Sequence, residues 1–330
     1  MKMKSSSFLV MLIPAIVFGQ TEGTRQEIPR DTSFTISNTV PKVLKEYPTV
    51  TLVAAAVPPG VKAMENIVYA TDGARALHLD LFMPEEKSST PRPCVLIIHG
   101  GGWRSGNRQM EWPMAQHLAV KGYVTAAVEY RLSVEAMYPT GIYDLKAAIR
   151  WLRAHASSYN IDPEKFAAYG CSAGGELAAF LGTTGDMKKF EGTVGETGSS
   201  SRIQAVVDID GILDFSDPAE SGKDTDPAKP SAGKAWFGGS FKEKPERWKE
   251  ASPIHYLSKK TAPILFVNSS QPRFHAGRDE GIGILKQFGV YTEVHTIANT
   301  PHPFWLFHPW FDEALGYIVS FLDKTLAHGR

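Results

Sequence analysis

The residues best suited to nucleophilic chemistry lie in the segment Tyr-Gly-Cys-Ser-Ala-Gly-Gly at positions 169–175. An apolar stretch at 166–169 precedes the serine and a helix-like stretch at 176–181 follows it, so Ser172 is expected at a sharp strand-to-helix turn. Such a turn strains the serine backbone, and residues as small as glycine leave room beside it. The pattern predicts that Ser172 presents its hydroxyl as a nucleophile, although an ordinary tight turn would show the same local sequence.

A second glycine-rich segment, His-Gly-Gly-Gly-Trp at positions 99–103, directly follows the apolar strand-like residues 95–98. A hydroxyl that attacks a carbonyl group develops negative charge on the carbonyl oxygen, and each important backbone N–H group fixed around that oxygen stabilises it by roughly 3–4 kcal/mol. We expect Gly101, Gly102, Trp103 and Ala173 to form this oxyanion hole, with Ala173 supplying the amide that follows the nucleophile.

Together these motifs resemble those of serine esterases with the α/β-hydrolase fold, over roughly residue 65 to the C-terminus. Further matching pieces are the Tyr130-Arg131 pair, the helix-like residues 143–155, the Asn-Ile-Asp-Pro run at 160–163, and Thr-Pro-His-Pro-Phe at 300–304. The resemblance implies a mostly parallel central sheet with helices on both faces, loop insertions over the active site, and an acyl-enzyme Ser-His-Asp mechanism. It implies no cofactor and no metal.

The base of this mechanism is expected in the loop after the last strand. In this fold the order along the chain is serine, acid, histidine. Residues 292–298 are expected to form the last strand, so the loop that follows places His302 as the base. His308 is the alternative.

The acidic residue of the triad departs from the pattern usual in this fold, in which an aspartate lies a few residues after the penultimate strand. The expected penultimate strand at 264–267 is followed by residues 268–271, which contain no carboxylate, and the first aspartate after them is Asp279. We therefore expect Asp279 to orient the histidine, with Asp210 and Asp214, after the preceding strand, as the alternatives.

The segment at 267–279 is similar to that of bacterial carbohydrate esterases, in the branch that includes pectin methylesterases. This similarity implies a plant polysaccharide or oligosaccharide ester as substrate, with pectin first and acetyl xylan or feruloyl esters as alternatives. Arg273, His275 and Arg278 are expected to bind it, because a guanidinium can pair in bidentate fashion with a uronate carboxylate. Aromatic residues at 236–248 would suit sugar stacking or simple packing. A catalytically silent hydrolase fold that binds carbohydrate is the alternative of another class.

The whole chain of 330 residues, 43% of them hydrophobic, is long enough for one large α/β domain. We divide it into a signal peptide at 1–19, an N-terminal extension at 20–64 and a catalytic domain at 65–330. The signal peptide predicts export to the periplasm or medium, with no membrane attachment of the mature form. The formal net charge is zero, so the protein has no overall positive electrostatic field that would attract nucleic acid. The two cysteines, Cys94 and Cys171, are expected to be free buried thiols. The oligomeric state stays open.

Overall fold

A mixed β-sheet organises the computed structural model, which describes residues 28–185, 187–222 and 230–327. In these residues the sheet has eight strands in the order β2-β3-β5-β4-β6-β7-β8-β9. The β2 and β3 strands form an antiparallel pair, β3 is antiparallel to β5, and every pairing from β5 to β9 is parallel. The strands are β2 (Val61–Asp72), β3 (Arg75–Pro84), β4 (Arg92–Ile98), β5 (Val124–Val128), β6 (Ile161–Cys171), β7 (Ala205–Ile209), β8 (Ile264–Ser269) and β9 (Thr292–Ile297).

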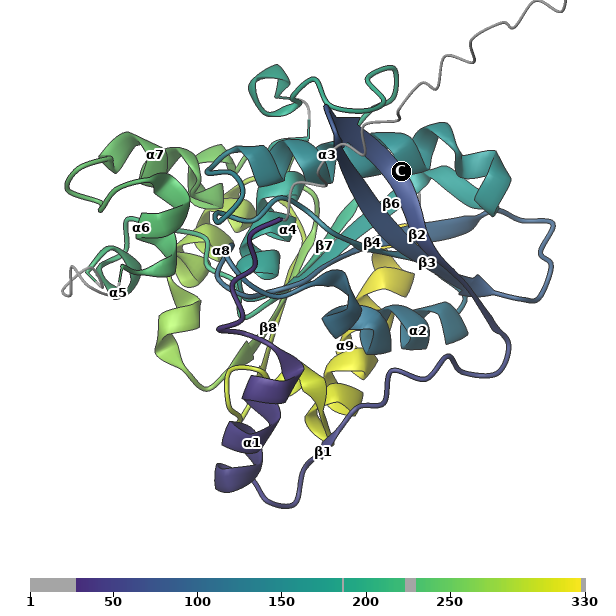
Figure 1. The fold of residues 1–330 in the computed structure, drawn as a ribbon, viewed down its shortest axis with the longest axis horizontal. Helices are drawn as coiled ribbons and strands as arrows, with labels where there is room; N and C mark the ends of the chain where they lie inside the picture. Colours follow the sequence, from purple (N-terminus) through teal and green to yellow (C-terminus); the bar gives the residue numbers. More distant parts are fainter. Residues whose placement is uncertain (1–27, 186, 223–229, 328–330) are drawn as a thin grey trace, which may run out of the picture.

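Helices cover both faces of this sheet (Figure 1). Residues of α3, α4 and α8 pack in one core, and residues of α1, α2 and α9 pack in the other. The helices are α1 (Ile36–Glu46), α2 (Trp112–Val120), α3 (Thr140–Ala154), α4 (Ala173–Thr183), α5 (Pro218–Ser221), α6 (Ala232–Phe237), α7 (Pro245–Glu250), α8 (Arg278–Gln287) and α9 (Trp310–Ala327). This is the α/β-hydrolase arrangement, and the predicted fold class is confirmed.

The strand sequences explain the two cores. Along β4 the side chains of Leu96 and Ile98 enter the core beneath α3 and α4, whereas Val95 and Ile97 enter the core beneath α2 and α9. All four are fully buried. A strand covered on both faces needs such a continuous apolar run, because successive side chains point to opposite sides. The carboxyl ends of β4, β6 and β7 therefore meet at one edge of a rigid sheet, where ligand sites form in open α/β folds.

The N-terminal extension packs on the main domain. Its short strand β1 (Thr51–Leu52) pairs antiparallel with β10 (Phe307–His308), which follows the loop of His302. Asp31 accepts a 2.7 Å hydrogen bond from Arg104 Nε, next to the glycine-rich segment. Figure 1 shows α1 beside α9, and the rings of Tyr47 and Trp310 meet at 5.1 Å. The predicted signal peptide lies outside the described residues, and no described helix is long and apolar enough to cross a membrane.

The insertion between β7 and β8 carries α5, α6 and α7. Its aromatic side chains Trp236, Phe237 and Trp248 are almost fully buried and pack on one another and on Phe215. These rings therefore pack against other side chains in the interior. Of the two roles considered from the sequence, sugar stacking and simple packing, the structure supports simple packing. These aromatic residues belong to the same hydrophobic core as the residues of α3, α4 and α8.

Candidate active site

The nucleophile turn has the geometry that the sequence predicts. Ser172 stands between β6 and α4 with φ 55° and ψ −120°, a left-handed conformation that a non-glycine residue rarely adopts. Its backbone N–H donates to the Ile209 carbonyl at 2.7 Å, which ties the turn to β7. A Cβ atom at Gly170 would clash with the Gly174 carbonyl, and one at Gly174 would clash with the Ile98 carbonyl. The glycines are required because three backbone segments meet here.

The glycine-rich segment lies against this turn. Gly101, Gly102 and Trp103 all have positive φ, at 118°, 60° and 56°. A Cβ atom at Gly100 would lie 2.7 Å from the Cys171 carbonyl oxygen, so the segment and the turn are in backbone contact. The amides of Gly102 and Ala173 donate to no acceptor in the described residues. Both residues line the small cavity that contains Ser172. Two unused amides beside a hydroxyl suit an oxyanion hole.

Three side chains form a hydrogen-bonded chain at the carboxyl edge of the sheet. His302 Nε2 lies 2.9 Å from Ser172 Oγ, and His302 Nδ1 lies 2.9 Å from Asp210 Oδ2. Asp210 is fully buried, and its other oxygen, Oδ1, accepts the Ser269 N–H at 2.7 Å. Nucleophile, base and orienting carboxylate are thus within direct hydrogen-bonding distance of their partners.

The imidazole of His302 is held between aromatic rings. Phe274 stacks on it at 3.7 Å, and Trp305 meets it edge-on at 5.1 Å. Removal from water lowers the pKa of His302 below its ordinary value, while the hydrogen bond and charge of Asp210 oppose this shift. A lowered pKa keeps the ring neutral near pH 7, and a general base must be neutral to accept a proton.

The prediction that Asp279 is the acid is wrong. Its side chain is 77% exposed in the first turn of α8 and pairs with Arg278. Asp210, one of the two alternatives from the preceding strand, occupies the acid position. The other, Asp214, accepts from Ser216 and Ser252 instead. His308, the alternative base, pairs with Asp312 on α9 and is not part of the chain of hydrogen bonds.

The predicted substrate-binding residues divide into two groups. Arg273 is half-exposed and lines the cavity beside Ser172. His275 and Arg278 do not line it, and this part of the prediction is corrected. His275 Nε2 lies 3.3 Å from the Ser269 carbonyl, and Arg278 Nη1 donates to Asn268 Oδ1 at 2.9 Å. Both side chains therefore stabilise the loop after β8 through contacts with the end of that strand.

Sequence reasoning missed one charged residue of the cavity. Glu220, at the end of the β7–β8 insertion's first helix, lines it and pairs with Arg273 through both oxygens, at 2.6 and 3.3 Å. Burial raises the pKa of Glu220, and the charge of Arg273 opposes that shift. Nothing in the local sequence marks this glutamate, because 53 residues separate it from its partner.

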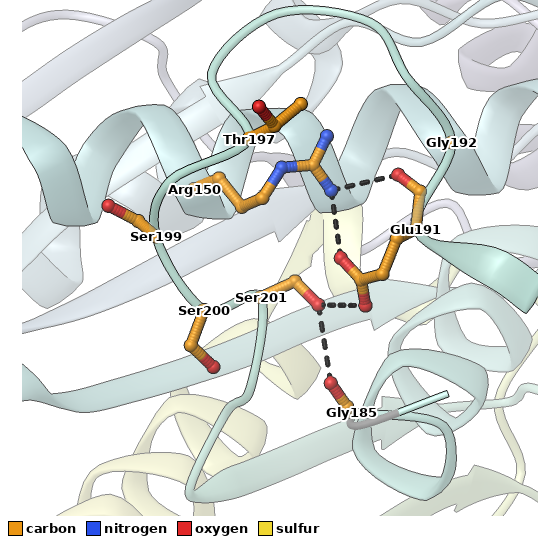
Figure 2. A pocket seen from close by; sticks show the side chains of 8 residues that line it. All are labelled: Arg150, Gly185, Glu191, Gly192, Thr197, Ser199, Ser200 and Ser201. Atoms are coloured by element: carbon orange, nitrogen blue, oxygen red, sulfur yellow. Dashed lines mark hydrogen bonds and ion pairs between the residues drawn. The ribbon is translucent and has the colours of Figure 1, made fainter. Parts of the chain in front are cut away.

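The catalytic cavity is small, about 50 Å³. A larger pocket, of about 260 Å³, lies between α3 and the segment at 185–201 (Figure 2). There Arg150 and Ser201 both contact the Glu191 carboxylate, and no histidine is among the described residues that line the pocket. A serine or threonine hydroxyl needs a neighbouring base to act as a nucleophile, so we place the catalytic site in the smaller cavity.

Neither cysteine participates. Cys94 and Cys171 are free and buried, as predicted, and burial raises the pKa of the Cys94 thiol to about 12. Among the described residues, no group of three or more His, Cys, Asp or Glu side chains is arranged to hold a metal ion.

The sheet, the strained serine turn and the Ser172-His302-Asp210 chain define an α/β-hydrolase with the residues of a serine hydrolase. Comparison with known proteins gives the family. Residues 79–274, more than half of the chain, match the BD-FAE family, and the chain belongs to this family of α/β-hydrolase esterases.

Curated relatives are named as esterases. Esterase LipC of Mycobacterium tuberculosis is 29% identical over 209 residues, which cover 62% of this chain and 50% of that protein. The probable carboxylic ester hydrolase LipM of the same organism is 35% identical over 156 residues, which cover 44% of this chain and 36% of that protein. The chain thus spans half or less of the length of these relatives.

Solved structures share the fold. A truncated form of a carbohydrate esterase from gut microbiota superposes with a TM-score of 0.70 at 23% identity, over 84% of this chain and 100% of that one. An esterase of the planctomycete Thermogutta terrifontis superposes with a TM-score of 0.64 at 24% identity, over 81% of this chain and 92% of that one.

Proposed function

We propose that this protein is a serine carboxylic ester hydrolase that works through an acyl-enzyme. The observation that carries the proposal is the Ser172-His302-Asp210 chain, with 2.9 Å between the base and each partner, beside two unused amides. The names of the curated relatives support ester hydrolysis as the reaction.

The geometry gives each group one role. His302 Nε2 accepts the Ser172 hydroxyl proton as Oγ attacks the ester carbonyl carbon, and Asp210 keeps the remaining proton on Nδ1. The amides of Gly102 and Ala173 hold the oxyanion of the tetrahedral intermediate. His302 then gives its proton to the leaving alcohol as the C–O bond breaks. Water, deprotonated by His302, attacks the acyl-enzyme, and the acid leaves with Ser172 restored.

We further propose that the substrate is an ester of a plant polysaccharide, most specifically methyl-esterified pectin. Support comes from the similarity of the segment at 267–279 and from Arg273. Glu220 occupies the Nε–Nη2 side of that guanidinium, and Nη1 donates to no acceptor in the described residues. The guanidinium therefore keeps a second donor edge, Nη1 with Nη2, for a substrate uronate. Export to the periplasm or medium is part of this proposal and is supported by residues 1–19.

The test compares the wild type with Ser172→Ala on three kinds of ester. Release of methanol, acetate and ferulate is measured from pectin, acetyl xylan and feruloylated arabinoxylan, and labelling by a fluorophosphonate probe is measured in parallel. We expect methanol release from pectin to be fastest, and the variant to lose turnover and labelling. Full turnover in a clean Ser172→Ala preparation would refute the mechanism, and preferential acetate or ferulate release would replace pectin by that substrate. No turnover or labelling in the wild type would indicate the silent carbohydrate-binding fold.

A further inference from the structure

Two contacts hold the Trp103 side chain in place. Its ring stacks on Trp236 at 4.9 Å with an angle of 6° between the planes. Its Nε1–H donates to Glu176 Oε2 at 2.9 Å. Because Trp103 itself has positive φ and follows Gly102, this one hydrogen bond connects the strained glycine-rich segment to the helix that begins after Ser172. Glu176 thus links the two halves of the oxyanion hole.

Glu176 is fully buried in the first turn of α4. In the described residues it forms no ion pair with a lysine, arginine or histidine, and its Oε1 atom has no hydrogen-bond partner. Its charge interacts with the ionisable groups of Asp208, Tyr130 and Tyr138, none of which is a cation. Burial raises the pKa of Glu176 well above its ordinary value; the Trp103 hydrogen bond opposes the shift and the charge of Asp208 adds to it.

The balance of energies favours the uncharged form. The N-terminal end of a helix stabilises a negative charge by about 0.3–1 kcal/mol. Leaving a carboxylate unpaired in the interior costs several kcal/mol, even after relaxation of the protein. The helix end is therefore too weak to keep Glu176 ionised.

We propose that Glu176 is a positioning residue that acts as a neutral carboxylic acid and fixes Trp103, and with it the amides of the oxyanion hole, against the nucleophile helix. In this state Oε2 accepts the Trp103 Nε1–H, and Oε1 carries the proton. The inference rests on the proposed esterase function, because it assigns a part in that reaction.

Asp208 is a second buried carboxyl group beside the start of α4, and its charge acts on Glu176. Its Oδ1 accepts the Gly211 N–H at 2.7 Å, while its Oδ2 is buried without a partner, as Glu176 Oε1 is. A Cβ atom at Gly211 would clash with Asp208 Oδ1 and would lie 2.5 Å from Glu176 N, so the aspartate lies against the start of α4.

Kinetics of three variants test the positioning role. Glu176→Gln reproduces the shape of the neutral acid and keeps one acceptor oxygen beside a donor group. We expect its kcat on nitrophenyl acetate to fall less than threefold. Glu176→Leu and Trp103→Phe each remove one partner of the hydrogen bond. We expect their kcat to fall about 10- to 100-fold with KM within threefold, because small displacements of catalytic groups cost that much. The affinity for an aryl trifluoromethyl ketone, whose adduct with Ser172 places an oxyanion in the hole, should fall in parallel.

Glu191→Gln is the matched control for lost stability. It removes a half-buried carboxylate that pairs with Lys146 and Arg150 at the pocket of Figure 2, which Ser172 does not line. We expect a lower Tm and an unchanged kcat at a permissive temperature. If Glu176→Leu and Trp103→Phe behave like this control, Glu176 stabilises the core only and the proposal is overturned.

The pH dependence of Tm tests the protonation state without any turnover. A carboxyl whose folded pKa is raised loses stability as pH rises above its unfolded value of about 4.3, whereas glutamine does not. The Tm of Glu176→Gln minus that of the wild type should therefore increase between pH 5 and pH 9, by more than about 2 °C. A difference that decreases with pH would mean that Glu176 works as an anion. If the wild type hydrolyses no ester, the proposed function fails, and this measurement still decides the state of Glu176.

Discussion

Replacing Asp210 by asparagine should nearly abolish turnover, because the surroundings fix which way the new amide points. Asp210 Oδ1 accepts from the Ser269 N–H at 2.7 Å and from Asn268 Nδ2 at 3.4 Å. In the Asp210→Asn variant these two donors hold the asparagine side-chain oxygen at the Oδ1 position. The side-chain NH₂ group must therefore face His302 Nδ1. Nδ1 then accepts a hydrogen bond and the ring proton moves to Nε2. In that tautomer His302 has no lone pair for the Ser172 proton.

The expected loss in kcat is about 10³- to 10⁴-fold, the range for an orienting aspartate with intact geometry. At 1.36 kcal/mol for each factor of ten this corresponds to about 4–5.5 kcal/mol of transition-state stabilisation. The assay is steady-state hydrolysis of nitrophenyl acetate, with circular dichroism and Tm to show that each variant folds.

Asp279→Asn is the matched control, since it makes the same chemical change on an exposed side chain. It should stay within about twofold of the wild type, as surface substitutions have small effects. If Asp210→Asn keeps more than a tenth of the activity, or if both variants fall equally, the carboxylate at Asp210 does not orient His302 and the tautomer argument fails.

Three further outcomes follow from the site. Since burial lowers the pKa of His302, the acid limb of kcat/KM should have its midpoint below about 6.5, and a midpoint above 7 in a pH profile would contradict the neutral base. Arg273→Lys keeps the charge but loses the planar fork, so hydrolysis of partly methylated polygalacturonate should fall at least threefold while nitrophenyl acetate changes little; equal losses on both would indicate that Arg273 supports the loop. N-terminal sequencing of the protein recovered outside the cytoplasm should lack residues 1–19, and an intact Met1 there would contradict signal-peptide removal.

The fold and two of the three triad residues could be predicted because their signals are local. The turn at Ser172 needs glycines on both sides within a few residues, since backbone from the glycine-rich segment and from α4 fills the space. His302 lies in the short loop that follows β9, and a loop of a few residues leaves it little freedom of position. In both cases chain connectivity brings the functional atom to the edge of the sheet.

The contacts of Glu220 and Glu176 carry no such local signal. Glu220 meets Arg273 only because the β7–β8 insertion folds back over the sheet. Glu176 has the helical spacing of an ordinary first-turn residue, and its partner Trp103 lies 73 positions away in the sequence. Such partners depend on tertiary packing, which the sequence pattern around each residue does not encode.

The sequence does not fix the acidic residue of the triad, because adjacent parallel strands end at the same level of the sheet. Ile209 of β7 pairs with Val267 of β8, so Asp210 lies beside Asn268, the position at which this fold usually has its aspartate. Neighbouring strands are about 4.8 Å apart, and a carboxylate after either one can reach the same imidazole. Asn268 donates to Asp210 and accepts from Arg278, so the residue that replaces the usual acid now positions the carboxylate one strand away. The Asp-Ile-Asp-Gly run that ends β7 was the available signal, because aspartate tolerates the positive φ of 50° that Asp210 adopts at that turn.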